Sequence, residues 1–477
     1  MLETRGSILR ALGVAALAAP MVMFWSLYFL PGHDPAIMAP TFHFYVVSFT
    51  ALAAALACAV VIASARTLRE TRLLFLGLAF FSIAAIFATH GLTTPGYLVD
   101  GYYASIGVSA WFSIAAGGAF IALSVVGVPH RVERLIEANG KTIAACAAVA
   151  LGLYIVLSLT VETWLNWVPI NDRTLQLTVG FGTLAVLGFA VWRYYQAYLF
   201  ARLPSQLVMA ATLVLLAEVQ LIILYGQVWH LSWWIYHGLY AVAFMVLFTG
   251  WAIEVRRAGT LRAIADALSM RDALAQLSRG LEAPLVQLVD AIEVKDVATF
   301  GHVRRVSSHA LAVGKKLGLS ASDLRSLVLA AEMHDVGKVG IPSSILLKPG
   351  PLTDEEFAVI KTHTVLGHGI AEKVAALRPL ADVIRCHHER MDGTGYPDGV
   401  AGEKIPLLAR IISVADTYDA VISKRPYRDG LSHQEAIAEI QRVSGSQLDP
   451  KIVDIFVEVV GEGADAHATH PDEQAAA

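Results

Sequence analysis

The sequence predicts an all-α protein made of a polytopic transmembrane helix bundle, a connecting helix and a soluble helical domain. Of its 477 residues, 56% are hydrophobic and 16% are charged, and the mean hydropathy is +0.57. In a typical soluble domain roughly 45–50% of the residues are hydrophobic and about 25% are charged. Only 20 of the 76 charged residues precede residue 251. The front half is therefore far more apolar than the back half, and each half is long enough to form its own core.

Composition excludes several classes of protein. The net charge of −4 gives no basic footprint for binding DNA. The three cysteines, Cys58, Cys146 and Cys386, are far apart and show neither disulfide nor zinc-site spacing. A disordered chain, a secreted disulfide scaffold and a fibrous repeat are excluded. We expect disorder only in a tail, residues 461–477.

The front half contains eight apolar stretches. A bilayer core of about 30 Å needs roughly 20 apolar residues per helix. The candidate spans are residues 8–30, 41–64, 73–91, 103–127, 142–163, 175–196, 206–226 and 235–254. The first lacks a clean cleavage site and precedes seven more spans, so we interpret it as retained rather than as a signal peptide.

The basic residues predict the orientation of these spans, because cytoplasmic loops collect Lys and Arg. The loops on the opposite side carry only Arg173. The chain is therefore expected to be a multi-pass protein of the cell inner membrane, in contact with membrane lipid, with both termini cytoplasmic. The alternate connections hold Arg5, Arg10, Arg66, Arg69, Arg72, Arg131, Arg134, Lys141, Arg193, Arg202, Arg256 and Arg257. The expected outer aromatic belt consists of Trp164, Trp167, Trp229, Trp233 and Trp234.

Several polar residues of the front half are candidates for sensing. His33, His43, His90, His230 and His237 all map to the outer ends of spans or to outer loops. One interpretation is interfacial hydrogen bonding. The other is an outward-facing metal, cofactor or pH-sensing pocket, because imidazole binds metals and titrates near neutral pH.

One acidic residue, Glu218, lies inside the seventh span, with Gln220 nearby. A membrane carboxyl is costly and faces a bundle interior or a pathway. Glu218 is either a structural hydrogen-bonding group or part of signal or ligand sensing.

The connector, residues 255–284, is predicted to be a helix that continues the last span. Leucine and isoleucine recur at three- or four-residue steps from Leu261 to Leu281, which is typical of a short parallel coiled coil and therefore of a homodimer. The alternative is a single helix packed on the next domain. Pro284 fits a helix start, so we place the domain boundary there.

The back half, residues 285–460, carries eight of the sixteen histidines, and several of them lie beside acidic residues. His334-Asp335 closes an apolar helix, His363 lies on the helix opened at Thr353, and Asp416 lies on the helix 409–420. Imidazole and carboxylate suit Fe, Mn, Zn and similar ions. A carboxylate such as Asp335 can bridge two ions that activate water for in-line phosphoryl displacement.

Lys338 is one helical turn beyond His334 and could donate to a phosphate oxygen. Each of these signals is weak when taken singly, since a lone histidine is more often packed or solvated. His309, His368 and His433 have no partner pattern and are interpreted in that way. The series of these residues in their order along the chain is specific, although each of them alone is not.

Residues 290–455 resemble the HD-GYP family, a branch of the HD phosphohydrolase superfamily. Five long motifs carry the resemblance: Lys295-Asp296 through Gly301-His302; HDVGKVGIP at 334–342; LLKPGPLTDEEF at 346–357, with His363 following; HHERMDGTGYPDG at 387–399; and GEKIPLLARIISVADTYDA at 402–420, followed by KRPYR at 424–428.

The resemblance implies an all-α metal-dependent phosphodiesterase that hydrolyses cyclic di-GMP to linear pGpG and, in some members, on to GMP. Lys338 and Asp335 are the implied catalytic residues. The implied metal ligands are His302, His334, Asp335, His363, His387, His388 and Asp416. Substrate contacts are implied for Lys338, Arg425, Arg428, Gly395, Tyr396 and Pro397.

One departure from the family pattern concerns the number of ions. Some members hold a third ion with a Glu four residues before the first histidine, and Ala298 occupies that place. We therefore expect two divalent ions, Fe, Mn or similar, and a limited second step to GMP. Glu389 and Asp392 either orient histidine ligands or cap turns.

The predicted organisation is a membrane sensor at residues 1–254, the connecting helix at 255–284, the phosphodiesterase at 285–460 and the tail at 461–477. The membrane half serves as an input, and diguanylate-cyclase or effector proteins are conceivable partners. One alternative is a catalytically silent cyclic-dinucleotide receptor that signals through protein contacts. Another is a transporter with a regulatory domain, which the arginine-poor outer loops and the lack of paired broken helices disfavour.

Overall fold

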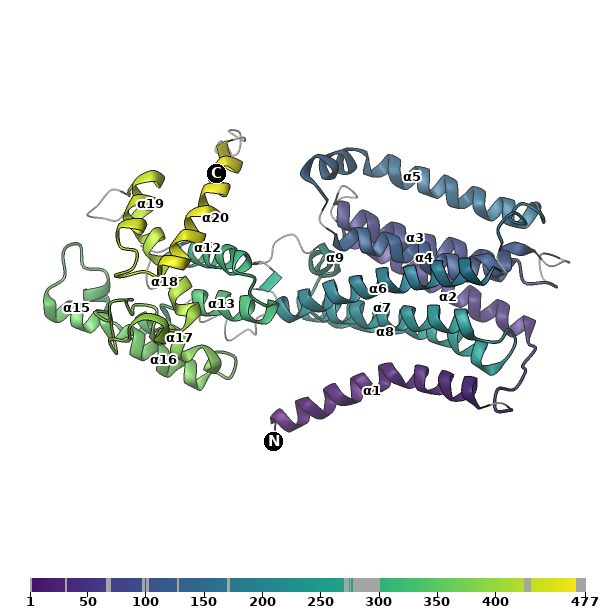
Figure 1. Cartoon of the computed structure of the whole chain (residues 1–477), viewed down its shortest axis with the longest axis horizontal. Coiled ribbons are helices and arrows are strands. Elements are labelled where there is room, and N and C mark those ends of the chain that lie inside the picture. Colours follow the sequence, from purple (N-terminus) through teal and green to yellow (C-terminus); the bar gives the residue numbers. More distant parts are fainter. Residues whose placement is uncertain are drawn as a thin grey trace. The chain divides into compact units, whose positions relative to one another are not determined.

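The computed structural model describes residues 2–30, 32–65, 70–96, 99, 103–126, 128–169, 172–269, 274, 276–277, 301–423 and 430–468. Its chain divides into two compact units. The first unit consists of Met1–Tyr198 and Arg202–Arg271, and the second consists of Leu199–Ala201 and Asp272–Ala477. The regular elements among the described residues of both units are helices, with no strand (Figure 1).

The first unit is a bundle of long helices. Eight of its described helices are long and apolar enough to cross a membrane, which confirms the predicted number. They are α1 (Leu2–Phe29), α2 (Pro40–Ser64), α3 (Thr71–Leu92), α4 (Ala104–Val125), α5 (His130–Thr160), α6 (Arg173–Ala201), α7 (Pro204–Tyr225) and α8 (Leu231–Ala258). α5 begins well before the predicted residue 142, because its polar first turns continue the helix of the span.

Packing within the bundle is uneven. α3 contacts α2 and α4, and α7 contacts α8 (Figure 1). The apolar segment of α3 is 83% buried, whereas the apolar segment of α1 is only 6% buried. Large apolar side chains such as Leu12 and Val149 are exposed. An apolar surface of this extent is unfavourable in water and suits a lipid environment.

The predicted connector helix is wrong in one respect. α8 ends at Ala258, and Gly259 adopts a left-handed φ of 70°, which is a common way for a helix to stop. A separate short helix, α9 (Arg262–Ser269), follows and packs against α2, α3, α7 and α8. Gln206 Nε2 donates to the Ala267 carbonyl at 3.1 Å. Residues 262–269 are therefore part of the first unit's core and are not available for a coiled coil.

The second unit is an all-α domain of shorter helices. Its core is formed by apolar side chains of α12, α13, α18 and α20, among them Val306, Leu327, Ile412 and Phe456. The elements are α12 (His302–Lys316), α13 (Ala321–Met333), η2 (Val336–Gly340), α14 (Ser343–Leu346), α15 (Asp354–Lys361), α16 (His363–Lys373), η3 (Arg378–Leu380), α17 (Ala381–Arg385), η4 (Gly402–Lys404), α18 (Leu407–Ile422), α19 (His433–Arg442) and α20 (Pro450–Ala468).

Two predicted boundaries differ from the structure. Thr353 caps α15 through a reciprocal capping box with Glu356, as its sequence suggests, but α15 ends at Lys361. His363 therefore begins the next helix, α16, instead of lying on the helix opened at Thr353. The tail predicted to be disordered from residue 461 is also partly helical, because α20 continues to Ala468. The rest of the tail lies outside the described residues.

Candidate metal centre

The predicted ligands of the second unit lie close together. Asp335 is common to two groups whose possible ligand atoms all lie within 4.8 Å of one another. One group adds His363, His387 and His388, and the other adds His302 and His334. Asp416 of α18 lies next to His302, with 3.3 Å between His302 Nε2 and Asp416 Oδ1. We refer to these seven residues as the second-unit cluster.

Helix ends orient three of the imidazoles. His334 ends α13, His363 follows α15, and His387 follows α17. In each case Nδ1 lies 2.7 Å from the backbone carbonyl three residues earlier, that of Ala331, Ile360 or Ile384. The last carbonyls of a helix lack intrahelical partners and accept such bonds. Since a carbonyl only accepts, Nδ1 must carry the proton, and in the neutral ring Nε2 presents a lone pair.

These Nε2 atoms converge on Asp335. Oδ1 of Asp335 lies 3.4 Å from His363 Nε2, and Oδ2 lies 3.4 Å from His334 Nε2. The two oxygens of one carboxylate therefore face two different histidines. This is the arrangement expected of a carboxylate that bridges two ions.

Charge and burial set the protonation of the cluster. Burial by itself raises the pKa of Asp335, but Lys338 and His334 more than offset it, so this pKa lies well below its usual value. Burial lowers the pKa of His388 to about 4. Burial also lowers the pKa of His302, yet hydrogen bonds to Asp416 and Asp419 raise it to about 9. At pH 7 the centre therefore combines ionised carboxylates with a neutral His388, whereas His302 carries a second proton that a bound cation would displace.

The donor set fits divalent metal ions. His334 Nε2 is buried, and among the described residues it has no well-formed hydrogen bond, although Asp335 Oδ2 lies 3.4 Å away. His363 Nε2 and His387 Nε2 lie 3.4 Å apart, although in the neutral rings neither holds a proton to share with the other. Two facing lone pairs repel each other, and a cation bound by both would remove that conflict. Nitrogen and carboxylate ligands together suit Zn, Fe and Mn.

One functional residue, Asp419, was missed by the sequence reasoning. Its Oδ2 accepts from His302 Nδ1 at 2.7 Å, and Arg305 donates to both of its carboxylate oxygens. Asp419 therefore fixes the ring so that Nε2 faces Asp416. The signal was its position three residues after Asp416, which places both carboxylates on one face of α18.

Lys338 lies on the short 3₁₀ helix η2 and contacts the cluster directly. Its Nζ is 2.6 Å from Asp335 Oδ2, and its side chain is 19% exposed. The preceding Gly337 allows η2 to press against α16, because a Cβ there would come within 1.9 Å of the His363 carbonyl oxygen. Any larger residue at 337 would push apart two segments that carry cluster residues.

The loop of residues 395–397 covers one side of the cluster. The Tyr396 ring lies 4.9 Å from that of His388. Gly395 packs on the histidine segment so closely that a Cβ would lie 2.5 Å from the Arg390 nitrogen. Pro397 follows through a cis peptide bond.

The hydrogen bonds of Glu389 and Asp392 fit the turn-capping alternative. The carboxylate of Glu389 accepts from the backbone amides of Asp398 and Val400, so it holds the loop. The carboxylate of Asp392 accepts from the amide and hydroxyl of Thr394 and from Arg390. Both acids therefore shape the loop beside the cluster.

Other predicted residues divide into three kinds. Arg425, Arg428 and Ala298 lie outside the described residues. His309 packs against Tyr418 and Phe456, and His433 bonds to the Tyr418 hydroxyl. The third kind comprises the sensor candidates of the first unit.

His43, His90 and His237 form a second group of possible ligands, which we refer to as the first-unit cluster. His230 is not in this group, and its Nδ1 lies 3.2 Å from the Val228 carbonyl oxygen. Glu218 is buried in α7 outside the group, and its Oε2 has no hydrogen-bond partner among the described residues.

Comparison with known proteins places this geometry in a class. Residues 287–452 match the model of the HD domain family, so the second unit contains an HD domain. The matched segment includes all seven residues of the second-unit cluster.

Curated relatives resemble the same part of the chain. The cyclic di-GMP phosphodiesterase response regulator RpfG of Xanthomonas campestris is 43% identical over 36% of this chain and 46% of its own length. A cyclic di-GMP phosphodiesterase of Thermotoga maritima is 38% identical over 38% of this chain and 50% of its own length. A 3′3′-cGAMP-specific phosphodiesterase of Vibrio cholerae is 34% identical over 39% of this chain and 36% of its own length.

The chain thus spans about half the length, or less, of these relatives. Among solved structures, Bd1817, an HDG“Y”P protein of Bdellovibrio bacteriovorus, aligns over 46% of this chain and 72% of its own, with 20% identity and a TM-score of 0.31.

Proposed function

We propose that the protein is a membrane-bound, signal-regulated phosphodiesterase that hydrolyses cyclic di-GMP, or a closely related cyclic dinucleotide, to the linear dinucleotide. The observation that carries this proposal is the second-unit cluster, in which Asp335 faces two separate sets of imidazoles. The relatives named above act on cyclic di-GMP or 3′3′-cGAMP, which supports the substrate class.

The proposed ligands form two subsites joined by Asp335. His363, His387 and His388 serve one ion, and His302, His334 and Asp416 serve the other. Divalent ions held there would supply an activated water nucleophile and would polarise the phosphodiester. Iron and manganese are the ions we propose, because mixed imidazole and carboxylate sites suit them.

The chain's own residues have distinct tasks in this reaction. Lys338 is close enough to Asp335 to exchange that contact for one with a phosphate oxygen, where its charge would stabilise the developing negative charge. Asp419 keeps the His302 ring in one orientation. Tyr396, beside His388, offers an aromatic face against which a guanine base can stack.

The proposed setting is the cell inner membrane, with both termini in the cytoplasm. The alternation of basic and arginine-poor loops supports this orientation. The eight apolar helices are compatible with a multi-pass protein. We propose the first unit as the input domain and the residues from 285 to 460 as the phosphodiesterase.

The test uses the full chain in detergent micelles, loaded with Mn²⁺ or Fe²⁺ without oxygen. Cyclic di-GMP and 3′3′-cGAMP are each incubated with it in ¹⁸O-labelled water, and the products are analysed by mass spectrometry. The expected product is a linear dinucleotide with one ¹⁸O in its new phosphate. Tight binding of a nucleotide by an ion-loaded chain that cleaves neither of the two would refute the enzyme and favour a silent receptor.

A further inference from the structure

The first-unit cluster is a candidate site of its own, unrelated in position to the HD domain sequence. His43 lies in the first turn of α2, His90 in the last turn of α3, and His237 in the second turn of α8. All three side chains are buried, with relative exposures of 4% or less. We propose that these three histidines bind one late first-row transition-metal ion.

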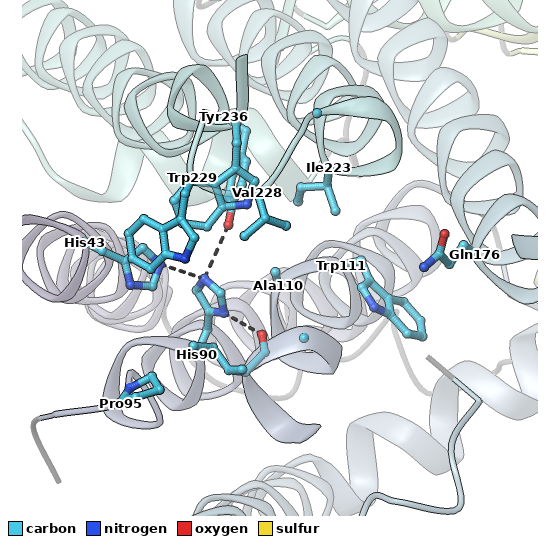
Figure 2. Close-up of a pocket in the computed structure, with 14 residues that line it drawn as sticks. His43, His90, Pro95, Ala110, Trp111, Gln176, Ile223, Val228, Trp229 and Tyr236 are labelled. Atoms are coloured by element: carbon cyan, nitrogen blue, oxygen red, sulfur yellow. Dashed lines mark hydrogen bonds between the residues drawn. The ribbon is translucent and has the colours of Figure 1, made fainter. Parts of the chain in front are cut away.

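The ring nitrogens of His43 and His90 point toward each other, as Figure 2 shows. His90 Nδ1 lies 2.7 Å from the Ile106 carbonyl oxygen and must donate to it. In the neutral ring, His90 Nε2 therefore presents a lone pair, and His43 Nε2 lies 3.0 Å from it. The Tyr236 hydroxyl also approaches this nitrogen, at 3.3 Å (Figure 2).

His237 supplies the observation that hydrogen bonding does not explain. Among the described residues, neither of its two buried ring nitrogens has a hydrogen-bond partner that meets the usual geometry. The Trp233 carbonyl, one turn earlier, interacts with the ring, but a carbonyl only accepts and can pair with at most one of the two nitrogens. The His237 ring lies 4.8 Å from that of His43 and is stacked on Tyr236. Buried polar atoms are rarely left unpaired, and a bond to a metal ion would satisfy one of these nitrogens.

The donor set selects the class of ion. Among the described residues the group offers three imidazoles and no carboxylate, which favours other ions over Ca²⁺ and Mg²⁺, since these two require oxygen ligands. Imidazole suits zinc, copper, iron and nickel, and three histidines leave a fourth position free on a tetrahedral ion. A cavity of about 340 Å³, lined by His43, His90 and aromatic side chains, adjoins the cluster (Figure 2). It has room for a water molecule or a small anion in that position.

A simpler arrangement competes with this proposal. The Thr94 hydroxyl, 3.0 Å from His43 Nδ1, could donate to that ring, which would then donate from Nε2 to His90. This chain of hydrogen bonds satisfies His43 and His90 without any ion. It leaves at least one ring nitrogen of His237 without a partner among the described residues, so substitution of His237 separates the two explanations.

Ion binding would have a mechanical consequence. The three ligands come from α2, α3 and α8, so a bound ion would tie together the ends of three helices that are far apart in the sequence. A site of this kind converts the availability of a metal into a change in helix packing. The proposal does not depend on the reaction of the HD domain.

Tryptophan fluorescence tests the site selectively, because all nine tryptophans precede residue 252 and the second unit has none. Trp233 lies 4.2 Å from the His237 ring and 5.2 Å from the His43 ring, between ring centroids. Co²⁺ is titrated into the metal-stripped full chain in detergent, since this paramagnetic ion quenches nearby indole emission. We expect saturable quenching in the wild type, because only ions bound at the first-unit cluster lie close to these indoles.

His237→Gln is the test variant and His230→Gln is the matched control. In His237→Gln a ligand is lost, so the affinity for Co²⁺ should fall by more than the roughly 10–100-fold that the loss of an orienting partner costs. In His230→Gln the affinity should be unchanged. Equal quenching curves for the wild type and His237→Gln would overturn the proposal.

A second measurement tests the site if the His237→Gln variant does not fold. The unfolding temperature of a chain with Asp335→Asn is measured with and without Zn²⁺, and the same is done after His43→Gln is added. A rise that disappears in His43→Gln supports the site, because a ligand that binds only the native state stabilises it. No change in unfolding temperature with Zn²⁺ would count against it.

Discussion

The second-unit cluster contains two carboxylates among its seven residues, whereas the first-unit cluster consists of three imidazoles. The second-unit cluster is mostly buried and the first-unit cluster wholly so, and both hold histidines in place through Nδ1 bonds to backbone carbonyls. They differ in the charge that they can compensate. Asp335 and Asp416 together neutralise two positive charges, while the imidazoles of the first unit neutralise none.

This difference fits the separate roles proposed for the two clusters. A pair of ions close together needs a bridging anion, because two bare cations repel each other strongly in a buried site. Only the second-unit cluster offers one. It also has a cation, Lys338, beside the carboxylate, where a phosphate would bind. The first-unit cluster suits a single ion whose binding alters helix packing.

The largest expected effect follows from removal of the bridging charge. Asp335→Asn keeps the size of the side chain but removes its charge, so we expect turnover of cyclic di-GMP to fall by about 10³-fold or more, as for loss of an essential catalytic group. Steady-state kinetics of the Mn²⁺-loaded chain measure this. Asp382→Asn is the control, because that side chain is 82% exposed. Turnover of Asp335→Asn within tenfold of the wild type would break the comparison.

Lys338→Gln should have the next largest effect. The amide retains hydrogen bonding but loses the charge that balances phosphate oxygens, so kcat should fall by roughly 10²–10³-fold. Metal content should stay the same, since Lys338 is not a ligand. A loss of metal together with a loss of activity would mean that Lys338 maintains the cluster instead of acting on the substrate.

Asp419→Asn should weaken metal binding rather than abolish it. The orienting bond to His302 Nδ1 becomes weaker, and we expect roughly a 10–100-fold lower affinity for Mn²⁺. Competition with a chelator of known affinity measures this. Asp454→Asn, at an exposed position of α20, is the matched control and should behave as the wild type. An unchanged affinity in Asp419→Asn would show that His302 needs no orienting partner.

Gly395→Ala should have the smallest effect of the four. Its Cβ would meet the backbone of Arg390 and Glu389, so the loop that carries Tyr396 must shift. We expect kcat/KM to fall by about tenfold through misplacement of the substrate. Gly369→Ala in α16 is the control, because a Cβ there meets nothing within 4 Å. Equal values of kcat/KM in the wild type and Gly395→Ala would show that the loop does not contact the nucleotide.

Much of the fold could be predicted because hydrophobicity determines it. The eight apolar stretches correspond to eight helices, and the charge imbalance between the halves corresponds to the two units. The break after Ala258 was missed, because apolar periodicity continues through Leu261 and Ile264 while the stop depends on the left-handed Gly259. Periodicity reports which face is buried, but it does not report whether the helix is continuous.

The site was predictable in its residue types but not in its geometry. The motifs identify His334, Asp335 and His387, whereas the bonds from their rings to helix-terminal carbonyls depend on where each helix ends. Asp419 escaped because its role arises from a contact with His302, more than a hundred residues away in the sequence. The meeting of His43, His90 and His237 likewise depends on how α2, α3 and α8 pack.

The bridging role of Asp335 is the central claim, and the electron paramagnetic resonance spectrum of the Mn²⁺-loaded chain tests it most directly. Two Mn²⁺ ions joined by a carboxylate are magnetically coupled, whereas separate ions give an isolated-ion spectrum. The wild-type chain should show a coupled pair, and Asp335→Asn should show isolated ions or none. An isolated-ion spectrum from a wild-type chain that holds two ions would contradict the account.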